Sequence, residues 1–474
     1  MRALLVALLA LAAAPAAWAG GPALRIGVAE DSVKRPTMAE TKAQLDLLEL
    51  AGLDSVRVSE TWTPGATAIA GDDLSQLTNI AGAATLDGLK VYVSISQFGS
   101  ATTPLSDADQ AAFAAYNASV AARFPDLAAI IVGNEPNLNR FWLPQFNPDG
   151  SDAAAPAFES LLAKTYDAIK TAAPNMQVIG VGLSPRGGDA SSAGGIRPTH
   201  SPTVFIQDLG AAYRASGRAT PIMDALGFHP YGDNSSQPPS FQHPNTTSIG
   251  MGDYGKLVAL LGAAFDGTAQ PGSTLPILYD EYGVESQIPA TKTAFYENTE
   301  KPTSVPTDET TQGAYYTQAL ALAFCQPNVE GVLLFHAFDE ADLQGWQSGV
   351  YYADETPKPS LPVVRNAAAL SRRGVIAHCD GLQLTPQLKS LVWPHAATTK
   401  SVRFSFTCDI DCAYVATLAK LRLTGTATGG VKKTVTFRNV PSGTWRIRLR
   451  VTAPVNPGPA RTSVGPLLHL PRKP

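Results

Sequence analysis

The chain has 474 residues, is 45% hydrophobic and carries a formal net charge of −4. This length predicts two or three domains, although one α/β barrel can take up 250 residues or more, and the hydrophobic share is sufficient for a large core. No basic run stands out, so neither nucleic acid nor an anionic membrane is expected as a partner.

The first residues have the pattern of an export signal. Met1-Arg2 gives a positive start, Ala3–Ala14 is apolar, and Ala17-Trp18-Ala19 ends on small residues. The apolar run is shorter than the roughly 20 residues that span a bilayer, and no later segment is a membrane-span candidate. We expect residues 1–19 to be a signal peptide and the mature protein to be secreted; a buried N-terminal helix is the alternative.

The four cysteines all lie in the last third of the chain, and an exported protein can form disulfides. Cys408 and Cys412 could close a small loop, which would leave Cys325 with Cys379. Four cysteines allow three pairings, however, and the sequence does not choose among them. A zinc site is the competing interpretation, although the C-x3-C spacing has no second ligand pair nearby.

From Leu24 to about Ala377, short apolar runs alternate with helical patterns. The runs are dense in Val, Ile, Leu and aromatic residues, as strands buried on both faces should be. Eight such strands between helices predict a (β/α)8 TIM barrel, which we place at residues 20–380. An open doubly wound sheet is the alternative, but no Gly-rich phosphate loop follows the first strand. The expected strands are Leu24–Val28, Ser55–Val58, Lys90–Ile95, Ala129–Val132, Gln177–Val181, Ala225–Phe228, Leu275–Tyr279 and Gly331–Phe335; expected helices include Met38–Ala51, Ala108–Phe124, Ala157–Ala173, Thr203–Ser216 and Thr310–Phe324.

Beyond Cys379 the pattern changes to alternating apolar and polar residues separated by turns. This is typical of antiparallel strands and predicts a small Ig-like β-sandwich at residues 381–474. We expect it to be a structural accessory, with a Pro-rich tail from Val455 that is partly disordered. The expected strands are Val402–Thr407, Ala413–Leu418, Lys433–Phe437 and Trp445–Val451.

Polar side chains follow the predicted barrel strands, and in such barrels the active site lies at the carboxyl ends of the strands. The fourth strand is followed by Asn134-Glu135-Pro136 and the seventh by Asp280-Glu281-Tyr282. These two strands lie on opposite sides of the barrel, so Glu135 and Glu281 can flank a bond across its mouth. Strand alternation predicts that Asp280 turns away from Glu281. Two carboxyl groups about 5–5.5 Å apart cleave a glycosidic bond with retention of configuration.

These motifs resemble those of glycoside hydrolase clan A, families 5 and 39, over residues 24–377. Asn134-Glu135 resembles the clan's acid/base motif on the fourth strand, and Glu281 matches its nucleophile on the seventh. Val56-Arg57-Val58 resembles the second-strand motif whose arginine keeps the nucleophile ionised. His229-Pro230-Tyr231 resembles the sixth-strand motif whose tyrosine hydrogen-bonds the nucleophile. The resemblance therefore implies a (β/α)8 retaining glycosidase.

The clan often places a tryptophan sugar platform at the end of the eighth strand, and here this sequence departs from the pattern. Phe335, His336 or the downstream Trp346 are candidates for the role. Trp142 and Trp62 are further candidates for stacking on sugar, with burial in the core as the alternative. Glu30 and Asp339 could bind sugar hydroxyls or be solvated rim charges.

We therefore expect a secreted, monomeric enzyme that hydrolyses O-glycosidic bonds of a polysaccharide, oligosaccharide or glycoside without metal or organic cofactor. Glu135 and Glu281 are the expected catalytic residues. Arg57, Asn134, His229, Tyr231, Trp142 and Trp346 are the expected residues around the substrate. A non-catalytic carbohydrate-binding barrel and a transglycosylase with the same residues are the alternatives.

Overall fold

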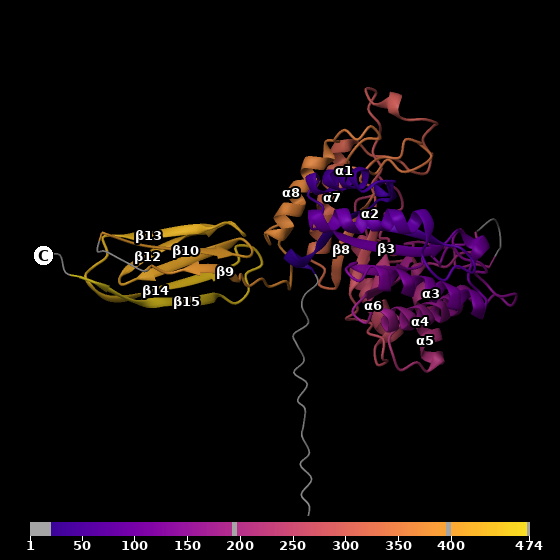
Figure 1. Ribbon diagram of the computed structural model, residues 1–474, viewed down its shortest axis with the longest axis horizontal. Coiled ribbons are helices and arrows are strands. Elements are labelled where there is room, and N and C mark those ends of the chain that lie inside the picture. The colour runs from indigo at the N-terminus through magenta and orange to yellow at the C-terminus, as the bar shows by residue number, and fades with distance from the viewer. Residues whose placement is uncertain (1–19, 192–196, 395–399, 472–474) are drawn as a thin grey trace, which may run out of the picture.

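The computed structural model describes residues 20–191, 197–394 and 400–471, so the expected signal peptide lies outside the described residues. The chain forms a barrel wrapped by helices and, beside it, a separate stack of strands (Figure 1). This is the predicted (β/α)8 barrel followed by an antiparallel β-sandwich. Over these residues, no helix combines the length and the apolar character needed to cross a membrane.

In the described part of the chain, eight parallel strands close the barrel, because β8 pairs with β1 as well as with β7. Each coincides with a predicted strand, with ends that shift by a few residues. The strands are largely buried, since one face meets the barrel interior and the other meets helices. They are β1 Arg25–Ala29, β2 Ser55–Trp62, β3 Lys90–Gln97, β4 Ala129–Val132, β5 Gln177–Leu183, β6 Ala225–Phe228, β7 Ile277–Tyr282 and β8 Val329–Phe335.

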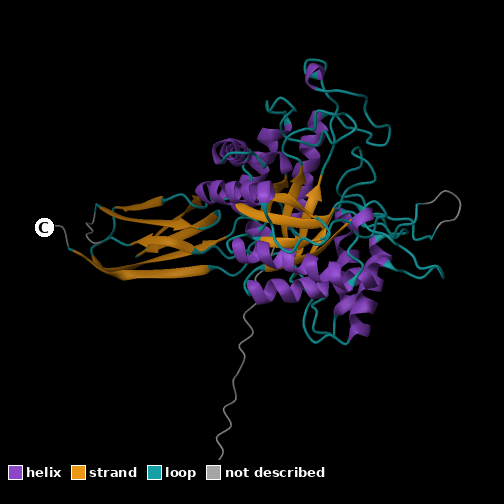
Figure 2. Cartoon of the chain, turned by 45° about the vertical axis from the view of Figure 1, so that its right-hand side comes forward, coloured by secondary structure: helices purple, strands orange, loops and turns teal. Residues whose placement is uncertain are grey.

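A helix follows each strand, and the helices surround the barrel (Figure 2). Local signals set their ends: α1 begins at a capping box of Thr37 and Glu40, and α5 ends at Gly217, whose φ of 65° suits a helix terminus. The helices are α1 Met38–Leu50, α2 Gly71–Asp87, α3 Asp107–Arg123, α4 Ala154–Ala172, α5 Pro202–Ser216, α6 Tyr254–Phe265, α7 Glu309–Phe324 and α8 Ser360–Arg372. Short 3₁₀ helices are η1 Gly21–Ala23, η2 Asp31–Val33, η3 Ser100–Thr102, η4 Met251–Asp253 and η5 Thr293–Phe295.

The barrel strands contribute a small apolar cluster of their own, distinct from the large core beneath the helices. It consists of Tyr92, Ala129, Ile131, Ile179, Ala225, Leu278 and Leu333. Further along the barrel strands, toward their carboxyl ends, buried positions become polar, as at Arg57, Ser94 and Asp280. The fold therefore packs one end of the barrel with hydrocarbon and gathers charged side chains at the other, where barrels of this kind place their sites.

The C-terminal sandwich is built from antiparallel sheets, and over residues 388–394 and 400–471 their orders are β13-β10-β9 and β12-β11-β14-β15. The prediction of a partly disordered tail is wrong for Arg461–Leu470, which forms β15. Pro466 is tolerated there because β15 is an edge strand and its pairing shifts register near this residue. The strands are β9 Leu388–Val392, β10 Ser401–Cys408, β11 Cys412–Leu418, β12 Leu421–Ala427, β13 Lys433–Arg438, β14 Gly443–Thr452 and β15 Arg461–Leu470.

All four cysteines are described, and they form the disulfides Cys325–Cys379 and Cys408–Cys412. The first ties the segment after α8 to the end of α7. The guanidinium of Arg373 binds both carboxylate oxygens of Asp411, at 3.0 and 2.7 Å, and so joins the barrel to the sandwich.

Candidate active site

A cavity of about 830 Å³ opens at the carboxyl ends of the barrel strands. Its wall is made by the loops after β4, β5, β6, β7 and β8, together with strand ends. Of the residues predicted to meet the substrate, Asn134, Glu135, Tyr231, Glu281 and Trp346 line this cavity. The structure thus brings together side chains that lie more than 200 positions apart in the sequence.

Glu281, near the end of β7, is held by the two partners that the sequence predicts for it. Arg57 Nη1 donates to Glu281 Oε1 at 2.6 Å, and the Tyr231 hydroxyl donates to Oε2 at 3.0 Å. Burial by itself would raise the pKa of Glu281, but the nearby cations His229 and Arg57 lower it below its usual value. Glu281 is therefore an ionised carboxylate beside the cavity.

Glu135 follows β4 and has an unusual backbone conformation, with a φ of 42°. A non-glycine residue in this region costs about 1–3 kcal/mol, and such residues cluster at functional sites. The conformation is fixed by the Glu135 N–H, which donates to the Gly182 carbonyl of β5 at 2.8 Å. The strained turn carries the Glu135 side chain to the cavity wall, opposite β7.

His229 joins the two carboxylates. Its Nδ1 lies 3.0 Å from Glu135 Oε1 and 3.5 Å from Glu281 Oε2, so these two oxygens are no farther apart than the sum of the two distances. Burial alone would lower the pKa of His229, but Glu281 and Asp280 raise it to about 10, which makes the ring an imidazolium cation. His229 is fully buried and is not on the cavity wall, so the predicted contact with substrate is replaced by contact with the carboxylates.

Two further residues of the site were not predicted. Asp280 is fully buried with its Oδ2 3.4 Å from His229 Nε2 and 3.8 Å from Arg57 Nε, and Ser94 on β3 accepts from Arg57 Nη2 at 2.9 Å. The sequence predicts that Asp280 turns away from Glu281, but both carboxylates lie against Arg57 and His229. The pairing of β7 with β8 shifts register between Tyr279 and Tyr282, where simple alternation fails. We call Arg57, His229, Asp280 and Glu281 the catalytic cluster.

One wall of the cavity is aromatic. Trp346, from the loop after β8, lies 5.1 Å from Tyr231 and 5.4 Å from Phe335 between ring centres, and all three line the cavity. Of the three candidates for a sugar platform, Trp346 and Phe335 line the cavity and His336 does not. This aromatic wall suits the flat apolar face of a sugar ring.

The other tryptophan candidates belong to the core. Trp142 is 1% exposed and packs edge-on against Phe158 of α4, and Trp62 is fully buried against Phe113 of α3. Neither lines the cavity. The prediction that Trp142 contacts substrate is therefore wrong. The loop sequence does not show what covers this ring, and in the structure the apolar face of α4 covers it.

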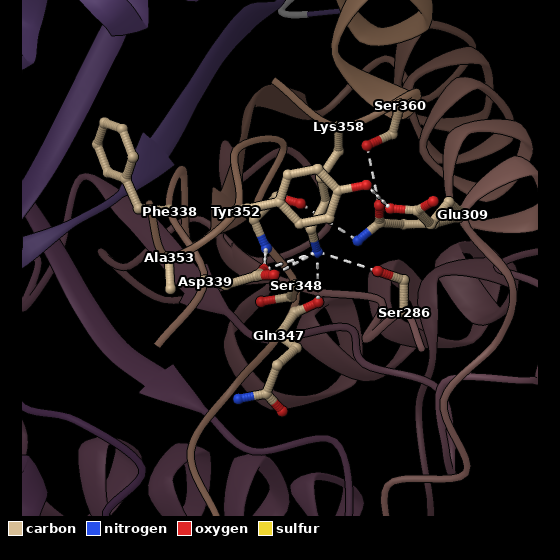
Figure 3. Close-up of polar contacts among 12 residues, drawn as sticks. Ser286, Glu309, Phe338, Asp339, Gln347, Ser348, Tyr352, Ala353, Lys358 and Ser360 are labelled. Atoms are coloured by element: carbon tan, nitrogen blue, oxygen red, sulfur yellow. Dashed lines mark hydrogen bonds and ion pairs between the residues drawn. The ribbon is translucent and has the colours of Figure 1, made fainter. Parts of the chain in front are cut away.

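Glu30 and Asp339 also turn inward and make structural contacts. Glu30 Oε2 accepts from the N–H groups of Ala337 and Phe338, at the start of the loop after β8. Asp339 forms a fully buried ion pair of 2.7 Å with Lys358 (Figure 3). Lys358 Nζ also donates to Ser286 Oγ and to the Gln347 carbonyl, and the Tyr296 hydroxyl donates to Asp339 Oδ2. We call Lys358, Asp339, Ser286 and Tyr296 the loop cluster.

No protein-family model and no curated protein sequence matches the chain. Solved structures do match. A family 39 glycoside hydrolase from the gut symbiont Bacteroides cellulosilyticus WH2 aligns over 92% of this chain and 74% of its own, with a TM-score of 0.52 and 14% identity. GH5_18 from Streptomyces cattleya, solved in complex with GlcNAc, aligns over 76% and 83%, with a TM-score of 0.50 and 18% identity. At this identity the likeness shows the fold, which is the barrel that the resemblance to families 5 and 39 implies.

Proposed function

We propose that the protein is a secreted retaining glycoside hydrolase that cleaves O-glycosidic bonds by double displacement. The observation that carries this proposal is the approach of Glu135 and Glu281 to the same His229 nitrogen at the edge of one cavity. Retaining enzymes hold their carboxyl groups about 5–5.5 Å apart, and inverting ones about 6.5–9.5 Å. The bound set by the two His229 distances favours the retaining arrangement.

The charges around each carboxylate suggest their roles. Glu281 is the nucleophile, because Arg57, His229 and the Tyr231 hydroxyl all stabilise its anionic form. Glu135 has one oxygen on His229, which leaves the other for the glycosidic oxygen. Asn134, on the cavity wall beside it, is placed to bond the 2-hydroxyl of the sugar, an interaction that strengthens in the transition state.

In the first step, Glu281 attacks the anomeric carbon while Glu135 gives its proton to the departing oxygen. The glycosidic bond breaks as the bond to a Glu281 oxygen forms, which produces a covalent glycosyl-enzyme. In the second step, Glu135 takes a proton from water, and the water oxygen displaces Glu281 from the same carbon. Two inversions at one carbon restore its configuration.

The disulfides support a place outside the cytosol, since such bonds persist in oxidising compartments. They agree with the export signal expected at residues 1–19. The enzyme would then meet its glycan outside the cell, as an enzyme for polysaccharides or large oligosaccharides must.

Two substitutions test the assignment on a panel of aryl glycosides and common polysaccharides. Glu281→Ala should lower kcat by about 10⁴-fold or more, as loss of a nucleophile does. Glu135→Ala should lose activity but regain part of it with azide on substrates with good leaving groups. Glu49→Ala, the same change at an exposed position on α1, is the control. Proton NMR of the first-formed anomer reports retention, and products at high acceptor concentration separate hydrolysis from transfer.

Normal activity in both variants would contradict the roles of the two glutamates. Glycan binding without turnover of any substrate in the panel would favour the non-catalytic alternative. If the first-formed anomer has inverted configuration, the protein would still be a hydrolase, but the proposed double displacement would be wrong.

A further inference from the structure

The wall of the cavity has a charge opposite to that of the whole protein. Apart from Glu135 and Glu281, which the catalytic cluster already partners, its only carboxylate among the described residues is Glu340. The chain as a whole has a net charge of −4. The cavity wall nevertheless carries several cations, namely Arg140, Arg186, Arg197 and Lys301. Like charges that share one cavity repel each other, so an anion that enters the cavity would relieve this repulsion.

The cations come from separate parts of the chain. Arg140 lies in the loop after β4, Arg186 and Arg197 in the loop after β5, and Lys301 in the loop after β7. Three loops that are far apart in the sequence thus place positive side chains on the wall of one cavity. Convergence of this kind creates a local field that raises the concentration of anionic ligands near the site.

Arg186 and Lys301 differ in how far partners within the protein engage them. Arg186 Nη1 donates to the Gly232 carbonyl at 2.5 Å. The closest carboxylate to Arg186 is Asp233, at 3.7 Å, and Asp233 also faces His243 at 3.4 Å. Across the described ranges, Lys301 forms no ion pair within 4.0 Å. Its Nζ instead lies 5.7 Å from the centre of the Trp346 ring. Lys301 is therefore held over the aromatic wall, where a sugar ring would stack.

Glu340 offsets one of these positive charges, and its contacts hold it within the loop after β8. Its Oε2 accepts from the N–H of Trp346 at 2.6 Å, and its Oε1 lies 3.8 Å from His336 Nε2. Glu340 therefore stabilises the loop that carries Trp346 and lies beside His336 of the same loop.

A side chamber of about 320 Å³ adjoins the cavity, and Arg186, Lys301, Trp346 and Glu135 line both. Its wall also holds Glu285, which is 4% exposed and has an Oε1 without a hydrogen-bond partner. Burial raises the pKa of Glu285 to about 7, although Lys301 opposes the shift. Near neutral pH this carboxyl group is thus only partly ionised. The chamber wall also holds Asp233, which faces Arg186, so among the described residues Lys301 is the cation there that forms no ion pair.

We propose that the substrate is an anionic glycan whose carboxylate or sulfate group lies between Arg186 and Lys301, beside the bond that Glu135 and Glu281 cleave. This inference rests on the proposed function and adds the chemical class of the substrate. Arginine binds planar oxyanions through paired N–H groups, and lysine supplies a point charge. A neutral sugar would use the aromatic wall and leave Lys301 without an anionic partner and Arg186 with Asp233 alone.

Binding is measured on the Glu281→Gln protein, so that no substrate is consumed. The probes are oligosaccharides in matched pairs: an oligouronate with its carboxyl-reduced form, and a chondroitin sulfate oligosaccharide with its desulfated form. By calorimetry, an anionic member should bind about 10- to 100-fold more tightly than its neutral partner, the range expected for hydrogen bonds between charged groups. The preference should weaken between low and high NaCl, because salt screens exposed charges. The first pair reports a carboxylate site and the second a sulfate site.

When Arg186→Gln and Lys301→Gln are introduced together into the Glu281→Gln protein, the preference for the anionic member of each pair should disappear. Adding Arg422→Gln and Lys432→Gln instead, which removes the same charge from exposed positions of the sandwich, should leave it intact. Equal affinity within both pairs, absence of binding to every anionic probe, or a preference that survives the cavity substitutions would overturn the proposal. Hydrolysis of neutral substrates by the unmodified protein would then still support the proposed function, whereas lack of hydrolysis of any glycan would contradict that function itself.

Discussion

Two buried ionic clusters lie at the same end of the barrel, and they differ in how their polar atoms are satisfied. In the loop cluster, Lys358 Nζ meets one acceptor for each of its protons, and Asp339 accepts from Lys358, Tyr296 and the Gly349 N–H. In the catalytic cluster, Arg57 Nε, His229 Nε2 and both Asp280 oxygens make no hydrogen bond of full geometry, and Asp280 Oδ2 meets the two nitrogens only as ion pairs of 3.8 and 3.4 Å. One cluster is complete within the protein, and the other is not.

This difference indicates that the loop cluster stabilises the fold and that the catalytic cluster serves the proposed reaction. A buried charge without full hydrogen bonding costs stability, so a protein keeps one only where the charge has a use. In the catalytic cluster, Arg57, His229 and Asp280 surround Glu281, the proposed nucleophile on the cavity wall. The loop cluster, by contrast, ties the loop after β7 to the loop after β8, which carries Trp346. Substitutions in the first should change activity most, and substitutions in the second should change stability most.

The largest effect is expected for Arg57→Met. Loss of this cation should lower kcat/KM by about 10³- to 10⁴-fold, comparable to loss of a residue that orients a catalytic group. Because Arg57 helps to lower the pKa of Glu281, its removal should raise that pKa. A nucleophile is active above its pKa, so the acidic limb of the kcat/KM profile should move to higher pH. The measurement is a pH–rate profile beside thermal unfolding.

Arg57→Met should destabilise the fold less than a break in the loop cluster, since Glu281 borders the cavity and can take up a proton from water. An unshifted acidic limb would show that Arg57 does not act through Glu281. If the folded fraction of Arg57→Met fell as much as its kcat/KM, the lost activity would be a loss of stability, and the distinction between the two clusters would fail.

Lys358→Met tests the loop cluster. It leaves Asp339 as a buried charge without its cation, and breaking a buried pair in this way costs about 3–5 kcal/mol of unfolding free energy. Chemical denaturation measures this loss. The folded fraction should keep the acidic limb of the pH profile, because Glu281 retains Arg57 and Tyr231. The double variant Lys358→Met/Asp339→Leu should recover part of the stability, and a double variant no better than the single one would contradict the buried-pair account.

The sequence predicts the barrel well and the surroundings of the site less well, and the reason is physical. Apolar runs with helical patterns between them reveal every barrel strand, and short motifs at strand ends locate Glu135 and Glu281, because these signals are local. Asp280 escapes prediction because a register shift in β7 reverses the expected alternation. No local sequence pattern identifies Arg186 and Lys301 as cavity residues, because their place on the wall depends on which loops come together in the fold.

Tryptophans show the same limit. Trp142 and Trp346 both follow barrel strands in long loops, and nothing in either loop tells one from the other. Packing decides: Trp142 is covered by Phe158, and Trp346 is left on the cavity wall. The sandwich strand β15 was missed for a related reason, because its proline is harmless only on the unpaired edge that the neighbouring strands define.

The smallest effects come from two tyrosine hydroxyls that form a matched pair: Tyr231 bonds Glu281 of the catalytic cluster, and Tyr296 belongs to the loop cluster. Tyr231→Phe removes a hydrogen bond of 3.0 Å to Glu281, and Tyr296→Phe removes one of 2.7 Å to Asp339. A hydrogen bond to a charged group contributes about 1.5–3 kcal/mol, so Tyr231→Phe should lower kcat/KM by about 10- to 100-fold while changing stability little. Tyr296→Phe should do the reverse, with a loss of about 1 kcal/mol because Lys358 and the Gly349 N–H still serve Asp339.

Each variant is the control for the other, because the chemical change is the same and both acceptors are carboxylates at the same end of the barrel. Steady-state kinetics and urea denaturation on both proteins give the comparison directly. If Tyr296→Phe lowers kcat/KM as much as Tyr231→Phe does, the loop cluster takes part in the reaction through the loop that carries Trp346. The division between a chemical and an architectural cluster would then be wrong, and the two would form one extended site.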